Sequence, residues 1–306
     1  MEKARLTFLG TGTSQGVPMI GCECPVCTST DHRDKRLRAS ALIEYCGLTI
    51  LVDAGPDFRY QMLRQGVNHL DAILLTHNHK DHTGGLDDIR AFNLLERHPV
   101  NIYCLDRVEK ALRGEYPYAF AENKYPGAPE WRVHTFDPSK PFTVPSNANE
   151  EILVWEKGFG YRHYPAKSHA DAKAEIIPLQ GWHHNEKILP VVGYRFGNIA
   201  YCTDMNFIPE EEFGKLQGLD HFIINTVKKG KHISHFALDE AVEVARRVGA
   251  RHSWLTHISH QLPRWSDLAA ELPGGAEAAR LLESGIAPEE LPEGSILPAF
   301  DGLVIR

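Results

Sequence analysis

The chain has 306 residues, with 33 lysines and arginines against 40 aspartates and glutamates, which gives a formal net charge of −7. This balance disfavours nucleic acid as a partner, because nucleic-acid binding usually leaves a basic electrostatic footprint. The sequence has no apolar run near the roughly 20 residues of a membrane span, and its start lacks a signal-peptide segment. We therefore expect a cytoplasmic protein without a membrane partner.

Short apolar runs recur along the chain, and each ends at a polar residue or a glycine. Five of them are predicted as strands, over residues 6–9, 48–52, 72–75, 199–202 and 253–255. Strands that end in polar residues of the kinds used in catalysis indicate a layered α/β fold, with the functional site along one edge of a sheet. Apolar spacing predicts helices over 86–97 and 238–248, the second behind Ser234 as a candidate cap. With no linker or repeat in the sequence, we expect a single domain over residues 1–306.

One segment differs in composition from its flanks. Residues 115–164 hold 11 of the 28 aromatic residues, together with many prolines. We interpret it as part of an aromatic-rich insertion around 115–175. Three roles fit: a hydrophobic satellite core, a lid over the site, or the arm of a homodimer.

The six cysteines fall into two groups. Three lie within six residues, at positions 22, 24 and 27. Unpaired, clustered thiols in a chain without a signal peptide indicate metal binding rather than a disulfide. The other three, Cys46, Cys104 and Cys202, each follow a tyrosine in an apolar run, and we expect them to be small buried hydrophobic residues.

The most informative motif is Thr-His-Asn-His-Lys-Asp-His-Thr-Gly-Gly at residues 76–85. In an extended segment His77 and His79 project to the same side, while Asp81 and His82 follow where the chain turns into a helix. This arrangement offers two nitrogens to one metal ion, and a carboxylate and a nitrogen to a second. Dinuclear hydrolytic sites need such a set, with ions about 3.5–4 Å apart that share a hydroxide.

This motif resembles the His-x-His-x-Asp-His hallmark of the metallo-β-lactamase superfamily. The resemblance implies a four-layer αββα sandwich and further ligands in a fixed order along the chain. His183 matches the third histidine, with His184 as the alternative, Asp204 matches the bridging aspartate, and His257 matches the last histidine. Asp53 fits the family's aspartate that orients a ligand rather than binding metal.

A narrower resemblance comes from the Cys22-Glu23-Cys24-Pro25-Val26-Cys27 segment. It is similar to the superfamily branch that contains the carbon–phosphorus lyase pathway phosphodiesterase for 5-phosphoribosyl 1,2-cyclic phosphate. That branch implies one structural zinc held by Cys22, Cys24, Cys27 and His260. Three thiolates and one imidazole would close a tetrahedral shell with no open position. The resemblance is weakest across 145–175, and its spacing is stretched between 183 and 193.

The implied chemistry uses two divalent ions, zinc or manganese, since histidine and carboxylate ligands suit several first-row metals. Asp81 would bind one ion and orient the attacking hydroxide. A leaving alkoxide needs a proton, and we assign His235 as general acid or ligand of the substrate phosphate, with His232 as second candidate. Lysines between 228 and 231 are candidates to hold a terminal phosphate, although such a run also fits a solvated loop.

The sequence thus predicts a phosphodiesterase for a small cyclic or nucleotide-like phosphorylated substrate. One alternative is an RNA-processing endonuclease of the same superfamily, which the −7 charge disfavours. Another is a cofactor-biosynthesis protein resembling the pyrroloquinoline quinone B protein, which the intact histidine motif disfavours. Flavin-linked di-iron oxidoreductases of this fold carry glutamate where this chain has His79. A catalytically silent, zinc-clamped binding module would hold one metal ion per chain instead of about three.

Overall fold

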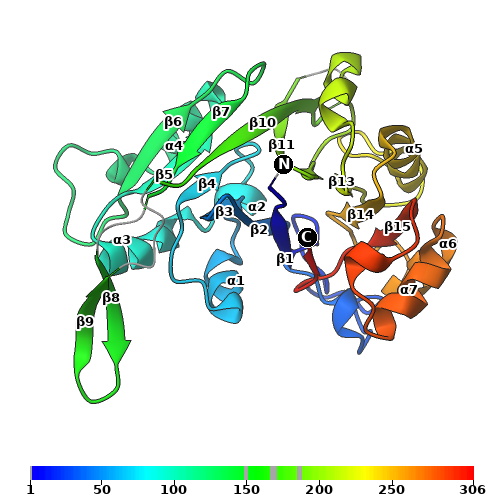
Figure 1. Ribbon diagram of the computed structural model, residues 1–306, viewed down its shortest axis with the longest axis horizontal. Coiled ribbons are helices and arrows are strands. Elements are labelled where there is room, and N and C mark those ends of the chain that lie inside the picture. The colour runs from blue at the N-terminus through cyan, green and yellow to red at the C-terminus, as the bar shows by residue number, and fades with distance from the viewer. Residues whose placement is uncertain (1, 148–150, 166–170, 185–187) are drawn as a thin grey trace.

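The computed structural model describes residues 2–147, 151–165, 171–184 and 188–306 (Figure 1). Two mixed seven-stranded sheets form its centre. The first runs in the order β16 (Val304–Ile305), β1 (Arg5–Gly10), β2 (Ser40–Tyr45), β3 (Leu48–Val52), β4 (Ala72–Leu74), β5 (Val100–Cys104) and β6 (Trp131–Thr135). The second runs in the order β15 (Ser295–Pro298), β14 (His252–Thr256), β13 (His221–Asn225), β12 (Ile199–Tyr201), β11 (Pro190–Phe196), β10 (Lys173–Trp182) and β7 (Phe142–Pro145).

Helices accompany both sheets. Those that follow strands of the first sheet are α1 (Phe58–Gln65), α2 (Lys80–Thr83), α3 (Arg90–Glu96) and α4 (Asp106–Glu115). Those of the second sheet are α5 (Leu238–Val248), α6 (Trp265–Glu271) and α7 (Gly275–Glu283), on the right of the view (Figure 1). Short 3-10 turns are η1 (His32–Asp34), η2 (Leu86–Ile89), η3 (Pro117–Ala119), η4 (Glu210–Leu216) and η5 (Pro288–Glu290). The predicted α/β sandwich of the metallo-β-lactamase type is confirmed.

Each sheet has a parallel part, and these parts set the position of the site. In the first sheet β3, β4, β5 and β6 are parallel neighbours. In the second, β12, β13, β14 and β15 are parallel neighbours. Such strands are covered on both faces and read as nearly continuous apolar runs, as β4 and β5 do with every residue buried. Residues that follow parallel strands therefore collect at one edge of each sheet.

Most predicted elements lie where the sequence placed them. β3 and α5 have the expected bounds, whereas the helix expected over 86–97 is divided into η2 and α3. The predicted cap of α5 is wrong. The helix starts after Ala237, whose amide donates to Glu240 Oε2 at 2.9 Å, while Ser234 Oγ lies 3.3 Å from His232 Nδ1. The Glu240 carboxylate thus accepts from the amide of the N-cap residue, and Ser234 makes no capping contact.

The predictions for the single cysteines are partly right. Cys104 and Cys202 are fully buried, as expected. Cys46 is half-buried and sits with a φ of 52° in the turn between β2 and β3. The tyrosine before it ends the strand, so the apolar run stops one residue earlier than predicted.

Part of the aromatic-rich segment belongs to the main hydrophobic core around the first sheet. Tyr116 and Trp131 are buried and meet edge to face at 5.1 Å between ring centroids. Phe136 and Phe142 stack at 4.3 Å. These four aromatic side chains thus pack into or against the core that the first sheet shares with the second. Residues 148–150 and 166–170 of the predicted insertion lie outside the described residues.

A hairpin, β8 (Glu151–Glu156) and β9 (Gly160–Pro165), extends from the body at the lower left of the view (Figure 1). Phe159 in its turn is 65% exposed. Within the described part of the chain, no helix combines the length and the apolar character needed to cross a membrane.

Candidate metal centre

The predicted metal ligands follow strands of both sheets. His77 comes after β4 in the first sheet, and its neighbours His79 and His82 flank the start of α2. His183 follows β10, while Asp204 and His257 follow β12 and β14 in the second sheet. A hydrogen bond from the amide of Val192 to the carbonyl of Thr76, 3.1 Å long, joins the two sheets beside this point.

The side chains form overlapping groups of metal-ligand atoms that lie within 4.8 Å of one another. These groups are His77/His79/His183, His77/His82/Asp204, Asp81/His82/His257 and His183/Asp204/His235. The first and third groups share no residue, so they outline two neighbouring cation positions. His184, the sequence alternative to His183, belongs to none of the groups found among the described residues.

The carboxylate of Asp204 lies between these positions. Its Oδ2 is 2.7 Å from His82 Nε2 and 3.0 Å from His257 Nε2. Its Oδ1 faces the other side, 3.6 Å from His183 Nδ1 and 3.3 Å from His235 Nδ1. With one oxygen toward each side, this carboxylate has the placement that a bridging ligand requires.

Hydrogen bonds to the outer ring nitrogens orient two of the histidines. His82 Nδ1 lies 2.6 Å from Asp53 Oδ2, and His183 Nδ1 lies 2.8 Å from the backbone carbonyl of Asp204. Because both partners are acceptors, each Nδ1 must carry the proton, which leaves Nε2 with a free lone pair. Asp53 therefore has the orienting contact expected from the sequence.

Thr76, which precedes the first ligand, holds Asp53 in place and was not predicted as a site residue. The amide and hydroxyl of Thr76 donate to Asp53 at 2.9 and 2.8 Å. Thr203 and Thr256 occupy the same position before Asp204 and His257, and all three threonines are fully buried. The repeated Thr-ligand pair at three strand ends was the sequence signal for this role.

The buried nitrogens at this site fit divalent metal ions. His77 Nε2 is buried and has no hydrogen-bond partner within the described residues, while His82 Nε2 and His257 Nε2 lie close to Asp204 Oδ2 without the geometry of a hydrogen bond. A buried polar atom without a partner costs about 1–3 kcal/mol, so such atoms are rare in folded proteins. Histidine nitrogens whose lone pairs converge beside carboxylates form the ligand set that zinc, manganese and related ions bind.

The electrostatics of the site also call for positive charge. Burial alone would raise the pKa of Asp204, but charges on His257 and His82 outweigh it and hold the pKa well below its usual range. Burial alone would lower the pKa of His82, yet Asp204, Asp53 and Asp81 raise it well above its usual value. Burial lowers the pKa of His77, which keeps that ring neutral. Asp204, Asp53 and Asp81 thus place three carboxylates around His82, a concentration of negative charge that bound cations would offset.

Backbone strain is concentrated at the same residues. Five non-glycine residues in the described chain have a positive φ between 52° and 61°, and three of them are Asp53, Asp204 and His257. The left-handed region costs a residue with a Cβ roughly 1–2 kcal/mol, and such strain persists where function requires a side chain in one position. Here it turns the three side chains inward at the strand ends.

Glycine permits the close packing beneath Asp81. A Cβ on Gly55 would lie 2.0 Å from the Asp81 carbonyl oxygen, and one on Gly85 would lie 2.1 Å from the Gly55 carbonyl oxygen. Neither contact is possible for a larger residue without moving the backbone. These two glycines therefore allow the segment that carries Asp81 to pack directly against the loop that follows β3.

The two histidines predicted for proton transfer differ in position. His235 packs among the ligands, with ring centroids 4.6 Å from His183 and 4.9 Å from His257. His232 lies farther out, 5.0 Å from His235, and its Nδ1 accepts a hydrogen bond from the Ser234 amide at 3.2 Å. Its Nε2 therefore carries the proton of the neutral ring. Of the nearby lysines, Lys229 pairs with Glu271 at 2.6 Å.

The cysteine segment and His260 form a separate four-residue group. Cys22, Cys24, Cys27 and His260 place their ligand atoms within 4.8 Å of one another. His260 Nδ1 is 3.4 Å from Cys22 Sγ and 3.5 Å from Cys24 Sγ. Tetrahedral zinc with Zn–S of about 2.3 Å and Zn–N of about 2.0 Å would place S and N about 3.5 Å apart. The separations therefore fit a closed zinc shell.

This group is attached to the last loop of the metal centre. The amide of Ile258 donates to the Thr11 carbonyl at 2.8 Å, and the Thr13 amide donates to the Ile258 carbonyl at 3.3 Å. His257 and His260 thus belong to one loop that contacts the first loop of the chain from both sides.

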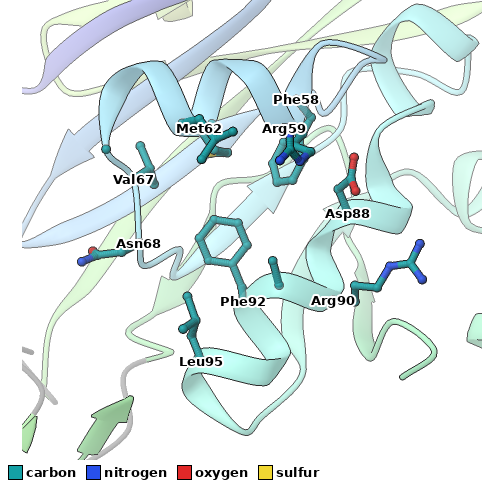
Figure 2. Close-up of a pocket in the computed structure, with 12 residues that line it drawn as sticks. Phe58, Arg59, Met62, Val67, Asn68, Asp88, Arg90, Phe92 and Leu95 are labelled. Atoms are coloured by element: carbon teal, nitrogen blue, oxygen red, sulfur yellow. The ribbon is translucent and has the colours of Figure 1, made fainter. Parts of the chain in front are cut away.

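An apolar cavity of about 580 Å³ lies elsewhere, between α1 and α3. Phe58 and Met62 of α1 face Phe92 and Leu95 of α3 across it (Figure 2). None of its lining residues was predicted as a site residue.

Comparison with known proteins agrees with this geometry. Residues 49–258 match the family model described as a beta-lactamase superfamily domain. A crystal structure described as a new diphosphatase from the PhnP family is 32% identical, with a TM-score of 0.74, over 99% of this chain and 98% of that chain.

Two curated relatives carry other names. An octanoyltransferase of Porphyromonas gingivalis is 36% identical over 271 residues, which are 88% of this chain but 49% of that protein. This chain therefore spans about half the length of that relative. A ribonuclease Z of Agathobacter rectalis is 26% identical over 262 residues, 74% of this chain and 83% of that protein.

Proposed function

This chain belongs to the metallo-β-lactamase superfamily and, within it, to the PhnP family, and we propose that it hydrolyses small phosphodiesters or diphosphates. The observation that carries the proposal is the pair of adjacent ligand groups, His77/His79/His183 and Asp81/His82/His257, with Asp204 between them. The similarity to a PhnP-family diphosphatase over nearly both whole chains supports the same substrate class.

Zinc or manganese ions are the proposed cofactors. Bound in pairs, such ions supply a nucleophile at neutral pH by lowering the pKa of water, and they neutralise charge on a phosphate. The pair would bring four positive charges against the two carboxylates of Asp81 and Asp204, so the loaded site would attract anionic phosphates.

The protein's own groups would orient the reactants. Asp81 is the more open of the two carboxylates, with 14% of its side chain exposed against 2% for Asp204. We propose that Asp81 orients the attacking water, because its carboxylate lies next to His82 and is partly exposed to the solvent from which a substrate would enter. Asp204 is more deeply buried, and its carboxylate would hold the two ligand groups in fixed positions relative to each other.

Proton transfer to the leaving oxygen falls to the loop before α5. His235 is in contact with the ligand groups, and His232 presents its Nε2–H farther out. We assign the leaving-group proton to His235, with His232 as the second candidate.

We also propose that the cysteine group holds a structural zinc. Its four donors leave no open position, and the S···N separations of 3.4 and 3.5 Å fit tetrahedral binding. Such an ion would fix the loop that carries His257.

An RNA-processing role is the second candidate, favoured by the ribonuclease Z similarity. The net charge of −7 counts against it, as RNA backbones attract basic surfaces. A role like that of the pyrroloquinoline quinone B protein is disfavoured by the complete histidine motif. We do not extend octanoyl transfer to this chain, which spans half of the relative with that name.

The test is hydrolysis of bis(4-nitrophenyl) phosphate and of a diphosphate diester by metal-loaded protein. Asp81→Asn should lower kcat/KM at least about 100-fold, because even residues that only orient ligands contribute 10- to 100-fold. Asp88→Asn, on η2 and outside every ligand group, is the matched control and should keep wild-type activity. Hydrolysis of phosphomonoesters or thioesters by the wild type, without any diester or diphosphate activity, would contradict the proposal.

A further inference from the structure

Arg107 lies beside the metal centre and was not singled out from the sequence. It is the second residue of α4, which begins directly after β5. β5 is the parallel neighbour of β4, the strand that leads to His77. Arg107 Nη1 donates to Asn78 Oδ1 at 3.1 Å, and Asn78 is the residue between the proposed ligands His77 and His79.

The charge of Arg107 is not matched by a carboxylate. The acidic residues of its own helix pair with other cations, Asp106 with Lys110 at 2.6 Å, Glu109 with Arg113 at 2.7 Å and Glu115 with Lys80 at 2.7 Å. Within the described ranges Arg107 has no ion pair. Burial lowers its pKa from the ordinary value, without an opposing carboxylate. A partly buried guanidinium without a carboxylate partner favours the binding of an anion from solution.

Asn78 extends the same donor surface toward the metal centre. Because the arginine can only donate, the oxygen of the Asn78 amide must face Arg107, and its NH2 group faces away. No hydrogen bond from that NH2 group is found within the described part of the chain. His79, the next residue, is among the more exposed of the proposed ligands. The guanidinium and the amide therefore stand on the open side of the site.

We infer that Arg107 and Asn78 form an anion subsite that binds the second phosphate of a diphosphate substrate. The inference rests on the proposed function, since the first phosphate would lie over the metal ions. Planar guanidinium groups suit phosphate because they donate two parallel hydrogen bonds. This subsite selects diphosphates over substrates with a single phosphate.

The first experiment measures binding and needs no turnover. Isothermal titration of the metal-loaded protein with ADP, used as its non-hydrolysable α,β-methylene analogue, and with AMP gives the preference for a second phosphate. We expect the wild type to bind ADP more tightly, and Arg107→Gln to reduce that preference at least about tenfold, the usual weight of a hydrogen bond to a charged group. Arg113→Gln, on the same helix but paired with Glu109, should retain it.

Two further variants test whether the effect of Arg107→Gln on binding is only structural. Arg107→Lys keeps the charge and should keep part of the ADP preference, whereas Asn78→Asp adds a negative charge and should abolish it. Circular dichroism and metal content check that each variant is folded and loaded. Equal affinity of the wild type for ADP and AMP, or equal loss of both ligands in Arg107→Gln, would overturn the subsite.

Kinetics separate this inference from the proposed function. In Arg107→Gln the ratio of kcat/KM for a diphosphate diester to that for bis(4-nitrophenyl) phosphate should fall at least about tenfold. If the wild type hydrolyses neither compound but prefers ADP through Arg107, the subsite stands and the proposed function fails. If it hydrolyses both with a ratio that Arg107→Gln leaves unchanged, the function stands and the subsite fails.

Discussion

Replacing His69 should weaken the fold in a way that depends on pH. His69 bridges two buried carboxylates, with Nε2 3.2 Å from Asp71 Oδ1 and Nδ1 3.1 Å from Glu96 Oε1. His98 also approaches Glu96, at 3.2 Å, and Asn147 donates to Asp71 at 2.8 Å. Burial alone would lower the pKa of His69, but the hydrogen bonds and charges of Asp71 and Glu96 outweigh it and raise the pKa to about 10.

The size of the effect follows from that pKa. In the unfolded chain a histidine has a pKa of about 6.5, and each pKa unit corresponds to about 1.36 kcal/mol. A rise to about 10 therefore corresponds to at most about 5 kcal/mol. Since 26% of the His69 side chain is exposed, solvent screens part of this energy, and we expect about 3 kcal/mol. The stabilisation is complete below the unfolded pKa and is lost as the pH rises toward 10.

The assay is urea unfolding of the wild type, His69→Gln and the control His32→Gln at several pH values from 6 to 10.5. His32 has 79% of its side chain exposed and should behave as wild type. The free energy of unfolding of His69→Gln should lie about 3 kcal/mol below the wild-type value near pH 6, and the gap should close above pH 10. A gap that stays constant over this range would show that His69 does not act through its charge.

Two other predictions concern the metal ligands and the proton donor. Cys24→Ser should release one zinc ion per chain and lower the melting temperature, because the closed shell loses a thiolate. The control Cys46→Ser, in a turn away from the cysteine group, should keep its metal. An unchanged melting temperature and metal content in Cys24→Ser would rule out the structural zinc. His235→Gln should lower kcat by about 10²–10⁴ for a diester with an alkyl leaving group and much less for a 4-nitrophenyl ester, whose anion leaves without a proton. If His232→Gln instead shows this dependence on the leaving group, the proton comes from His232.

Local spacing explains why part of the site could be predicted. The motif from His77 to His82 lies within six residues, so its geometry follows from one strand end and one helix start. His183, Asp204 and His257 are far apart in sequence, and they were found through the family order of ligands. Their convergence depends on how the two sheets pack against each other around a shared core, which no local pattern encodes.

Other features needed the packed structure. Arg107 reads as an ordinary helix surface residue, and its lack of a carboxylate shows only when the partners of its neighbours are known. The bridge from His69 to Asp71 and Glu96 joins a loop to a helix end across 27 residues, so it too is a tertiary contact. Ser234 was chosen as a cap from residue type alone, whereas the chain places Glu240 in that role.

One short loop, residues 257–260, completes both groups of metal ligands. His257 closes the centre at the sheet edge, and His260 closes the cysteine group. As the polypeptide leaves the ribosome, both groups of side chains therefore stay incomplete until this late tetrapeptide has been synthesised. If the cysteine group holds the proposed zinc, loss of that ion would also loosen the loop that carries His257, so one missing metal would disturb both groups.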